Sequence, residues 1–148
     1  MKKTFNILFV CRHNRFKSKF AESYFKKINR NPKILARSAG IFPGAYPLDK
    51  IEVETSKKFG VELKGYPKPV TTRLLRWNDL IILITNDIKN PYEIFNYGKY
   101  KNKFEVWGIE DNNYNSKEKV GNIHKQIIKR VSKLNKELKN ENWTSKRI

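Results

Sequence analysis

Hydrophobic positions along the chain alternate between short continuous runs and stripes at helical spacing. The apolar runs at 5–10, 79–84 and 104–107 have the length and β-branched or aromatic content of strands, and 33–38 reads as a fourth strand. Between the strands, apolar residues recur every three or four positions and predict helices at 18–28 and 48–59. The longest helical stripe comprises Val120, Ile123, Ile127, Val131, Leu134 and Leu138.

Local residue types define where several of these elements begin and end. Ser18 suits an N-cap or a first-turn position, and Gly60 suits the end of the second helix. Either Thr71 or Thr72 can cap a short helical turn, and a brief helix is predicted at 91–95. Four strands that alternate with helices therefore predict an α/β protein.

The most economical architecture is a three-layer sandwich with a doubly wound, four-stranded parallel sheet in flavodoxin-like order. We expect one domain over 1–138, followed by a polar C-terminal tail at 139–148. Right-handed crossovers bring the carboxyl ends of the strands to one edge of the sheet, where open α/β sheets bind ligands. The residues that follow strands at this edge are Cys11, Gly40, Asn86 and Gly108.

Composition narrows the class of protein. The chain has 148 residues, a single cysteine and two histidines, so an internal disulfide is excluded and a metal site with several ligands is not expected. No apolar run approaches the roughly 18 residues of a membrane helix, so we expect a soluble, cytoplasmic protein that needs neither a metal nor a cofactor.

The net charge of +18 attracts anionic molecules of every kind. It does not choose between nucleic acid, acidic proteins and phosphorylated small molecules. The lysines are scattered along the chain, which is also what a general over-use of lysine would produce.

Chemistry is concentrated in the segment Cys11-Arg12-His13-Asn14-Arg15-Phe16-Lys17-Ser18. A cysteine at the end of a strand, six residues before a cation at the start of a helix, lies in an electropositive position. Backbone N–H groups of the loop, the helix dipole and the nearby cations all favour a thiolate there. A thiolate among such donors can attack an anion that the same donors hold. The alternative is that Cys11 packs only as a small buried side chain.

The motif Ile7-Leu8-Phe9-Val10-Cys11-x-x-Asn14-x-x-Lys17-Ser18-x-x-Ala21-Glu22 resembles the opening signature of the low-molecular-weight protein tyrosine phosphatases, whose fold is shared by a group of arsenate reductases. The resemblance continues through nearly the whole chain. Its further motifs are Ser38-Ala39-Gly40, Lys58-Phe59-Gly60-Val61, Arg73-Leu74 and Glu110-Asp111.

By this resemblance, Cys11 is the nucleophile that forms a cysteinyl-phosphate, and Asp111 is the general acid that protonates the leaving oxygen. Asn14 and Ser38 match residues that support the loop, and Ser18 matches the hydroxyl that hydrogen-bonds the thiolate. The residues that we expect to line the substrate site are Arg12, His13, Asn14, Arg15, Phe16, Ser18 and Tyr114.

Lys17 is the largest departure from the family pattern, which has arginine at this position. Arginine grips two phosphate oxygens with a planar fork, whereas lysine is a flexible point charge. We therefore expect Lys17 to act catalytically at a reduced level, with Arg12 or Arg15 as possible substitutes.

The acid loop and the loop after the first strand depart as well. Asp111-Asn112-Asn113-Tyr114 lacks the proline and the first aromatic residue of the family pattern, and Asp87 is a rival general acid. His13 replaces a glycine, which predicts strain there, and Phe16 replaces the second loop cysteine of some members. The missing thiols disfavour arsenate reductases that pass a disulfide along their own chain.

Two functional hypotheses follow. The first is a phosphomonoester hydrolase that acts on a phosphorylated protein or a small aryl phosphate. The alternative is a weakly active or inactive phosphatase scaffold that binds phosphorylated partners or nucleic acid, although no nucleic-acid motif supports nucleic acid as the partner.

Overall fold

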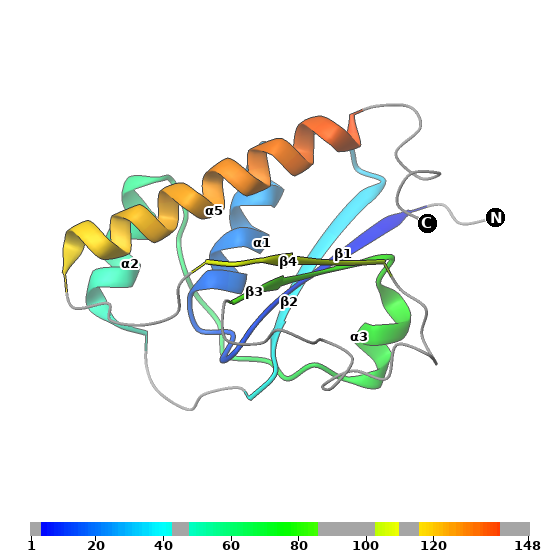
Figure 1. Ribbon diagram of the computed structural model, residues 1–148, viewed down its shortest axis with the longest axis horizontal. Helices are drawn as coiled ribbons and strands as arrows, with labels where there is room; N and C mark the ends of the chain where they lie inside the picture. The colour runs from blue at the N-terminus through cyan, green and yellow to red at the C-terminus, as the bar shows by residue number, and fades with distance from the viewer. Residues whose placement is uncertain (1–3, 43–47, 86–102, 110–115, 140–148) are drawn as a thin grey trace.

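The computed structural model describes residues 4–42, 48–85, 103–109 and 116–139, and Figure 1 shows the arrangement of its elements. In chain order these are β1 (Phe5–Cys11), α1 (Lys17–Ile28), β2 (Ile34–Gly40), α2 (Lys50–Lys58), α3 (Thr72–Trp77), β3 (Leu80–Ile84), β4 (Lys103–Trp107) and α5 (Lys117–Leu138). The predicted brief helix at 91–95 and Asn86 lie outside the described residues.

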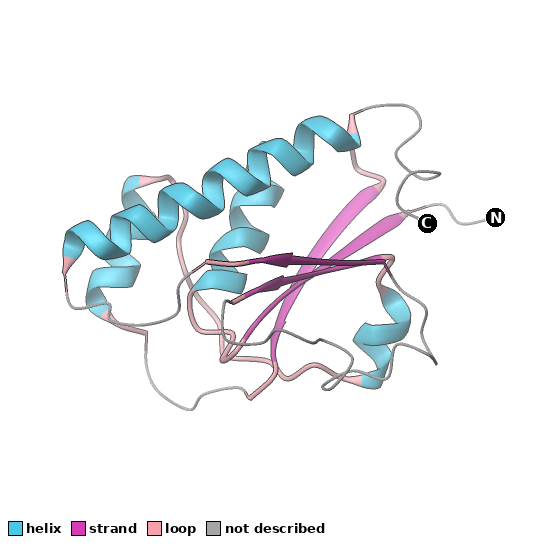
Figure 2. Ribbon diagram, viewed as in Figure 1, coloured by secondary structure: helices cyan, strands magenta, loops and turns pink. Residues whose placement is uncertain are grey.

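The four strands form one parallel sheet in the order β2-β1-β3-β4. Figure 2 shows this sheet between the helices. All residues of β1 and β3 are buried, as a central strand of a parallel sheet requires. The prediction of an α/β fold with a flavodoxin-like strand order is confirmed.

Alternate residues of β1 enter different layers because side chains of a strand point to opposite faces. Phe9 and Cys11 belong to the larger core, which α1 and α5 cover, while Val10 joins a smaller core with Leu74 and Leu75 of α3. Figure 1 shows α1, α2 and α5 on one face of the sheet and α3 on the other. The sandwich therefore has three layers, and the thiol of Cys11 lies on the α1 side.

The helices follow their apolar stripes, and all six residues of the predicted C-terminal stripe are buried in α5. The predicted ends differ by one or two residues. The N-cap of α1 is Phe16, so of the two positions predicted for Ser18 the first-turn position is confirmed and the N-cap is not. The Thr71 hydroxyl caps α3, and Gly60 follows α2 with a φ of 79°, in the left-handed region that favours glycine. Among the described residues, no helix is long and apolar enough to cross a membrane.

Gly40 ends β2 directly beside Cys11, with which it is paired in register. A Cβ atom on Gly40 would lie 2.7 Å from both the backbone nitrogen of Asn14 and the carbonyl carbon of His13. These are backbone atoms, so only glycine lets the loop after β1 approach the sheet this closely.

We expect Gly40→Ala to lower the free energy of unfolding by about 1 to 3 kcal/mol, because the new methyl group pushes the loop away from β2. Gly121→Ala in α5 is the matched control. A Cβ at Gly121 meets no atom within 4 Å, so this change should stabilise the helix by about 0.5 to 1 kcal/mol. Urea unfolding measures both values, and equal effects of the two substitutions would contradict the close approach.

Candidate active site

Cys11 is the last residue of β1, and its side chain is buried. Two polar groups face the sulfur: the Ser18 hydroxyl oxygen lies 2.9 Å from Sγ, and the backbone N–H of Asn14 donates to Sγ over 3.3 Å. A sulfur that accepts a backbone hydrogen bond and faces a hydroxyl group at the start of a helix is in a position that stabilises negative charge.

The orientation of the Ser18 hydroxyl follows from the Asn14 side chain. The Asn14 Nδ2 group donates to Ser18 Oγ over 2.8 Å and to Ser38 Oγ over 3.1 Å. Because Ser18 Oγ accepts from Asn14, its own proton is available to Cys11. Ser38 in turn donates to Glu22 Oε1 over 2.5 Å, so the protons of this network all run in defined directions.

Asn14 also fixes the backbone of the loop. Its φ is 53°, which makes it the only non-glycine residue in the described part of the chain with a positive φ. Its side chain is fully buried, and its Oδ1 accepts the backbone N–H of Lys68 over 2.8 Å. The left-handed residue of the loop is therefore Asn14 and not His13, so the strain expected at His13 was misplaced. Asparagine tolerates this conformation better than most residues.

Lys17 is the first residue of α1 and is 2% exposed. Its Nζ lies 3.4 Å from the carbonyl oxygen of Ile109, which it contacts as a donor. Arg15 extends toward Asp49, with 3.8 Å between Nη2 and Oδ1, and Arg12 is exposed. Three cations thus surround the loop, but they differ in direction and in burial.

A small pocket opens beside the sulfur. It is lined by Cys11, Arg12, His13, Arg15, Phe16, Lys17 and Glu52. The Phe16 side chain does not cap α1, and no acidic residue occupies the first turn of this helix, so no side chain there competes with a bound anion. Three of the lining side chains, Arg12, Arg15 and Lys17, are cations, so the pocket favours an anion.

Besides lining the pocket, Phe16 and His13 each contact a residue elsewhere in the chain, and the sequence did not predict either contact. The Phe16 ring packs on buried His124 with 4.6 Å between ring centroids, and His13 Nδ1 lies 2.6 Å from the carbonyl oxygen of Phe42. His124 bonds the Ser56 hydroxyl and the Val120 carbonyl, and burial lowers its pKa. A neutral His124 therefore supports the loop from the core side.

Three residues in the site were not predicted from sequence: Glu22, Lys68 and Glu52. The Glu22 side chain closes the hydrogen-bond network, and the Lys68 backbone holds Asn14. Burial raises the pKa of Glu52 to about 7, while the Arg15 guanidinium opposes this shift. The sequence motif contained Glu22, but no pattern pointed to Lys68 or Glu52.

The predicted general acid Asp111, its rival Asp87 and the predicted slot residue Tyr114 lie outside the described residues. Ile109, just before the segment with Asp111, is buried and receives the contact from Lys17.

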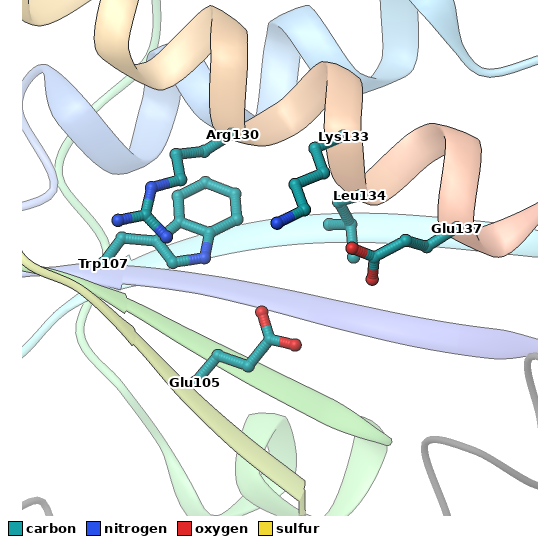
Figure 3. A pocket seen from close by; sticks show the side chains of 6 residues that line it. All are labelled: Glu105, Trp107, Arg130, Lys133, Leu134 and Glu137. Carbon is teal, nitrogen blue, oxygen red and sulfur yellow. The ribbon is translucent and has the colours of Figure 1, made fainter.

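A second pocket lies between β4 and α5, away from Cys11 (Figure 3). Glu105 and Trp107 project from the strand toward Arg130, Lys133, Leu134 and Glu137 of the helix. This pocket mixes both signs of charge, and no cysteine, serine or threonine lines it. Within the described ranges, no three His, Cys, Asp or Glu side chains could hold a metal ion together.

Comparison with known proteins finds a family whose sequence pattern covers most of the chain. Residues 6–144 match the family described as "Low molecular weight phosphotyrosine protein phosphatase". No curated protein matches the chain at the sequence level.

Solved structures resemble the fold. A YwlE mutant from Bacillus subtilis is 24% identical, with a TM-score of 0.79 over 93% of this chain and 100% of that one. A low molecular weight phosphotyrosine phosphatase from Vibrio cholerae O395 is 18% identical, with a TM-score of 0.80 over 93% and 98%. Vibrio vulnificus Wzb, solved in complex with benzylphosphonate, is 21% identical, with a TM-score of 0.75 over 90% and 98%. At these identities the structures support the fold alone.

We expect Asn14→Ala to lower the free energy of unfolding by about 2 to 4 kcal/mol, because it leaves several buried polar partners unsatisfied and strains a left-handed residue. It should also slow the alkylation of Cys11 by iodoacetamide, since Ser18 loses its orientation. Asn29→Ala is the control and should leave the alkylation rate unchanged, because the Asn29 side chain bonds Asn31 and Ile34 in the turn between α1 and β2 and not the cysteine loop. Unaltered alkylation in both variants would contradict the role given to Asn14.

Proposed function

The chain belongs to the low molecular weight phosphotyrosine protein phosphatase family, and we propose that it hydrolyses phosphomonoesters with Cys11 as the nucleophile. One observation carries this proposal: Cys11 Sγ, at the end of β1, faces the Asn14 N–H and the Ser18 hydroxyl inside a pocket that cations surround. A thiolate in a pocket suited to an anion has the two properties that phosphoryl transfer needs.

In the first step, the Cys11 thiolate attacks phosphorus and a sulfur–phosphorus bond forms. The bond between phosphorus and the ester oxygen breaks, and Asp111 gives its proton to the leaving oxygen. In the second step, Asp111 accepts a proton from water, which attacks phosphorus and releases inorganic phosphate and the thiolate. Neither a metal nor a cofactor is needed for these steps.

The other loop residues bind and position. Lys17 neutralises the transferring group, and the pocket-lining residues Arg12, His13, Arg15 and Phe16 contact the substrate. Asn14 and Ser38 hold the loop, and Ser18 donates to the thiolate that leaves in the second step. The hydrogen bonds that join Asn14 to Ser18 and Ser38 support these assignments.

The proposed substrate is a phosphorylated protein or a small aryl phosphate. The family description names phosphotyrosine, and the related Wzb structure holds benzylphosphonate, a phosphonate with an aromatic ring. Tyr114 would supply an aromatic wall for such a ring. A reducing, cytoplasmic compartment suits chemistry that depends on one unprotected thiol.

The purified protein should hydrolyse para-nitrophenyl phosphate, and Cys11→Ser should lower kcat by more than about 1,000-fold, because serine is a poor nucleophile without a general base. Release of nitrophenolate measures the rate, and circular dichroism verifies that the variant is folded. Equal turnover by the two proteins would refute Cys11 as the nucleophile.

Lys17→Arg should raise kcat by about 10- to 150-fold if one missing charge-assisted hydrogen bond limits the transition state. Lys19→Arg is the matched control: Lys19 is a buried neighbour on α1 whose Nζ donates to the carbonyl oxygens of Lys64 and Tyr66. The control should not raise kcat. A Lys17→Arg variant that is slower than the wild type would show that the site is built around lysine.

A further inference from the structure

Glu52 is a buried acid in the anion pocket. It lies in the first turn of α2, is 1% exposed and lines the same pocket as Cys11 and Lys17. A carboxyl group beside a thiolate and a phosphoryl group is unfavourable if it is charged, because three negative groups would then share one small space. Its presence therefore requires a physical explanation.

Glu52 also has a structural position. It is three residues after Asp49, the N-cap of α2, and the Asp49 backbone N–H opposes the rise of the Glu52 pKa. This is the acidic half of a capping box. Oε1 of Glu52 is buried and has no hydrogen-bond partner among the residues that the structure describes. Buried polar atoms are rarely left unpaired, so Oε1 points to a partner that arrives with a ligand.

The groups that face Glu52 set its charge. From the loop and α1 these are Cys11, Arg12, His13, Arg15 and Lys17, and from its own helix Asp49. Burial raises the pKa of Glu52 to about 7; Arg15 and the Asp49 N–H oppose this shift, and the Asp49 carboxylate adds to it. Arg15 Nη2 lies 3.8 Å from Asp49 Oδ1, so its charge acts on both acids. Below this pH Glu52 is a neutral acid with a proton to donate.

We propose that Glu52, as a carboxylic acid, donates a hydrogen bond from its buried end to an oxygen of the phosphoryl group bound beside Cys11, and so supplies a donor that Lys17 does not. This inference rests on the proposed function and adds a substrate-binding residue to it. The family arginine offers two parallel N–H donors to phosphate, whereas a lysine ammonium offers one contact in a given direction. Glu52 restores the second donor from another helix.

The sign of the pH effect follows directly. When Glu52 loses its proton, the donor disappears and a negative charge faces the anion, so affinity for oxyanions falls as the pH rises. The protonated fraction drops from roughly 0.9 at about pH 6 to roughly 0.1 at about pH 8, which predicts about a tenfold loss of affinity.

Sulfate is a suitable probe because it remains a dianion throughout this range, so only the protein titrates. Calorimetric titration of the full chain with sulfate at about pH 6 and about pH 8 is made on the wild type, Glu52→Gln and Glu52→Ala. Glu54→Gln is the matched control, since Glu54 is an exposed acid on the same helix that pairs with Lys50 over 3.9 Å. Circular dichroism verifies that each variant is folded.

Glutamine keeps an N–H donor that does not titrate. Glu52→Gln should therefore match the wild type at about pH 6 and lose the part of the pH dependence that Glu52 causes. Glu52→Ala should bind sulfate about tenfold more weakly than Glu52→Gln at about pH 6, because it has no donor. Glu54→Gln should follow the wild type.

Two results would overturn the inference. If Glu52→Gln keeps the full pH slope of the wild type, Glu52 does not titrate against the anion. If Glu52→Ala binds as tightly as Glu52→Gln, the carboxyl group supplies no donor. In either case sulfate binding and turnover by the wild type leave the proposed function intact, whereas a wild type that neither binds sulfate nor hydrolyses para-nitrophenyl phosphate refutes that function as well.

Discussion

The hydrogen bonds of one buried side chain, Asn14, determine the shape of the loop that carries Cys11. Its amide joins the loop to α1 through Ser18, to β2 through Ser38, and to the segment at Lys68. A carboxylate or an aliphatic side chain of the same size could not donate twice and accept once. The chemistry at sulfur depends on this amide, because it leaves the Ser18 proton for Cys11 and places the Asn14 N–H against the sulfur.

The types of the main elements could be predicted from sequence because they follow from strong periodicity, and the strand order was predicted from the alternation of strands with helices. The stripe on α5 and the all-apolar run of β3 leave little choice of element type. The cysteine loop was also recognisable, because its residues are adjacent in the chain. Element ends were less predictable: the sequence left Ser18 as either the cap or a first-turn residue of α1, and it lies in the first turn, where its hydroxyl contacts Cys11 Sγ.

The contributions from distant segments could not be predicted. Glu52 reads as an ordinary capping-box acid after Asp49, and nothing in a single sequence shows that the N-terminus of α2 faces the cysteine loop. One hydrogen-bond partner of His124, the Ser56 hydroxyl, is likewise 68 residues away in the chain. Such contacts depend on how layers pack, and packing is encoded by volumes and angles that a linear pattern does not express.

Local geometry, and not the net charge of +18, determines how tightly the pocket binds an anion. Lys19 illustrates the difference: burial lowers its pKa, and its Nζ is used by the carbonyl oxygens of Lys64 and Tyr66. Lys17 is also buried, and its Nζ contacts the Ile109 carbonyl next to the segment of Asp111. A lysine in this position contacts both the anion pocket and the end of the described chain after β4, which a surface lysine does not. The basic composition therefore raises the rate of encounter with anions, while a few oriented donors determine whether one stays.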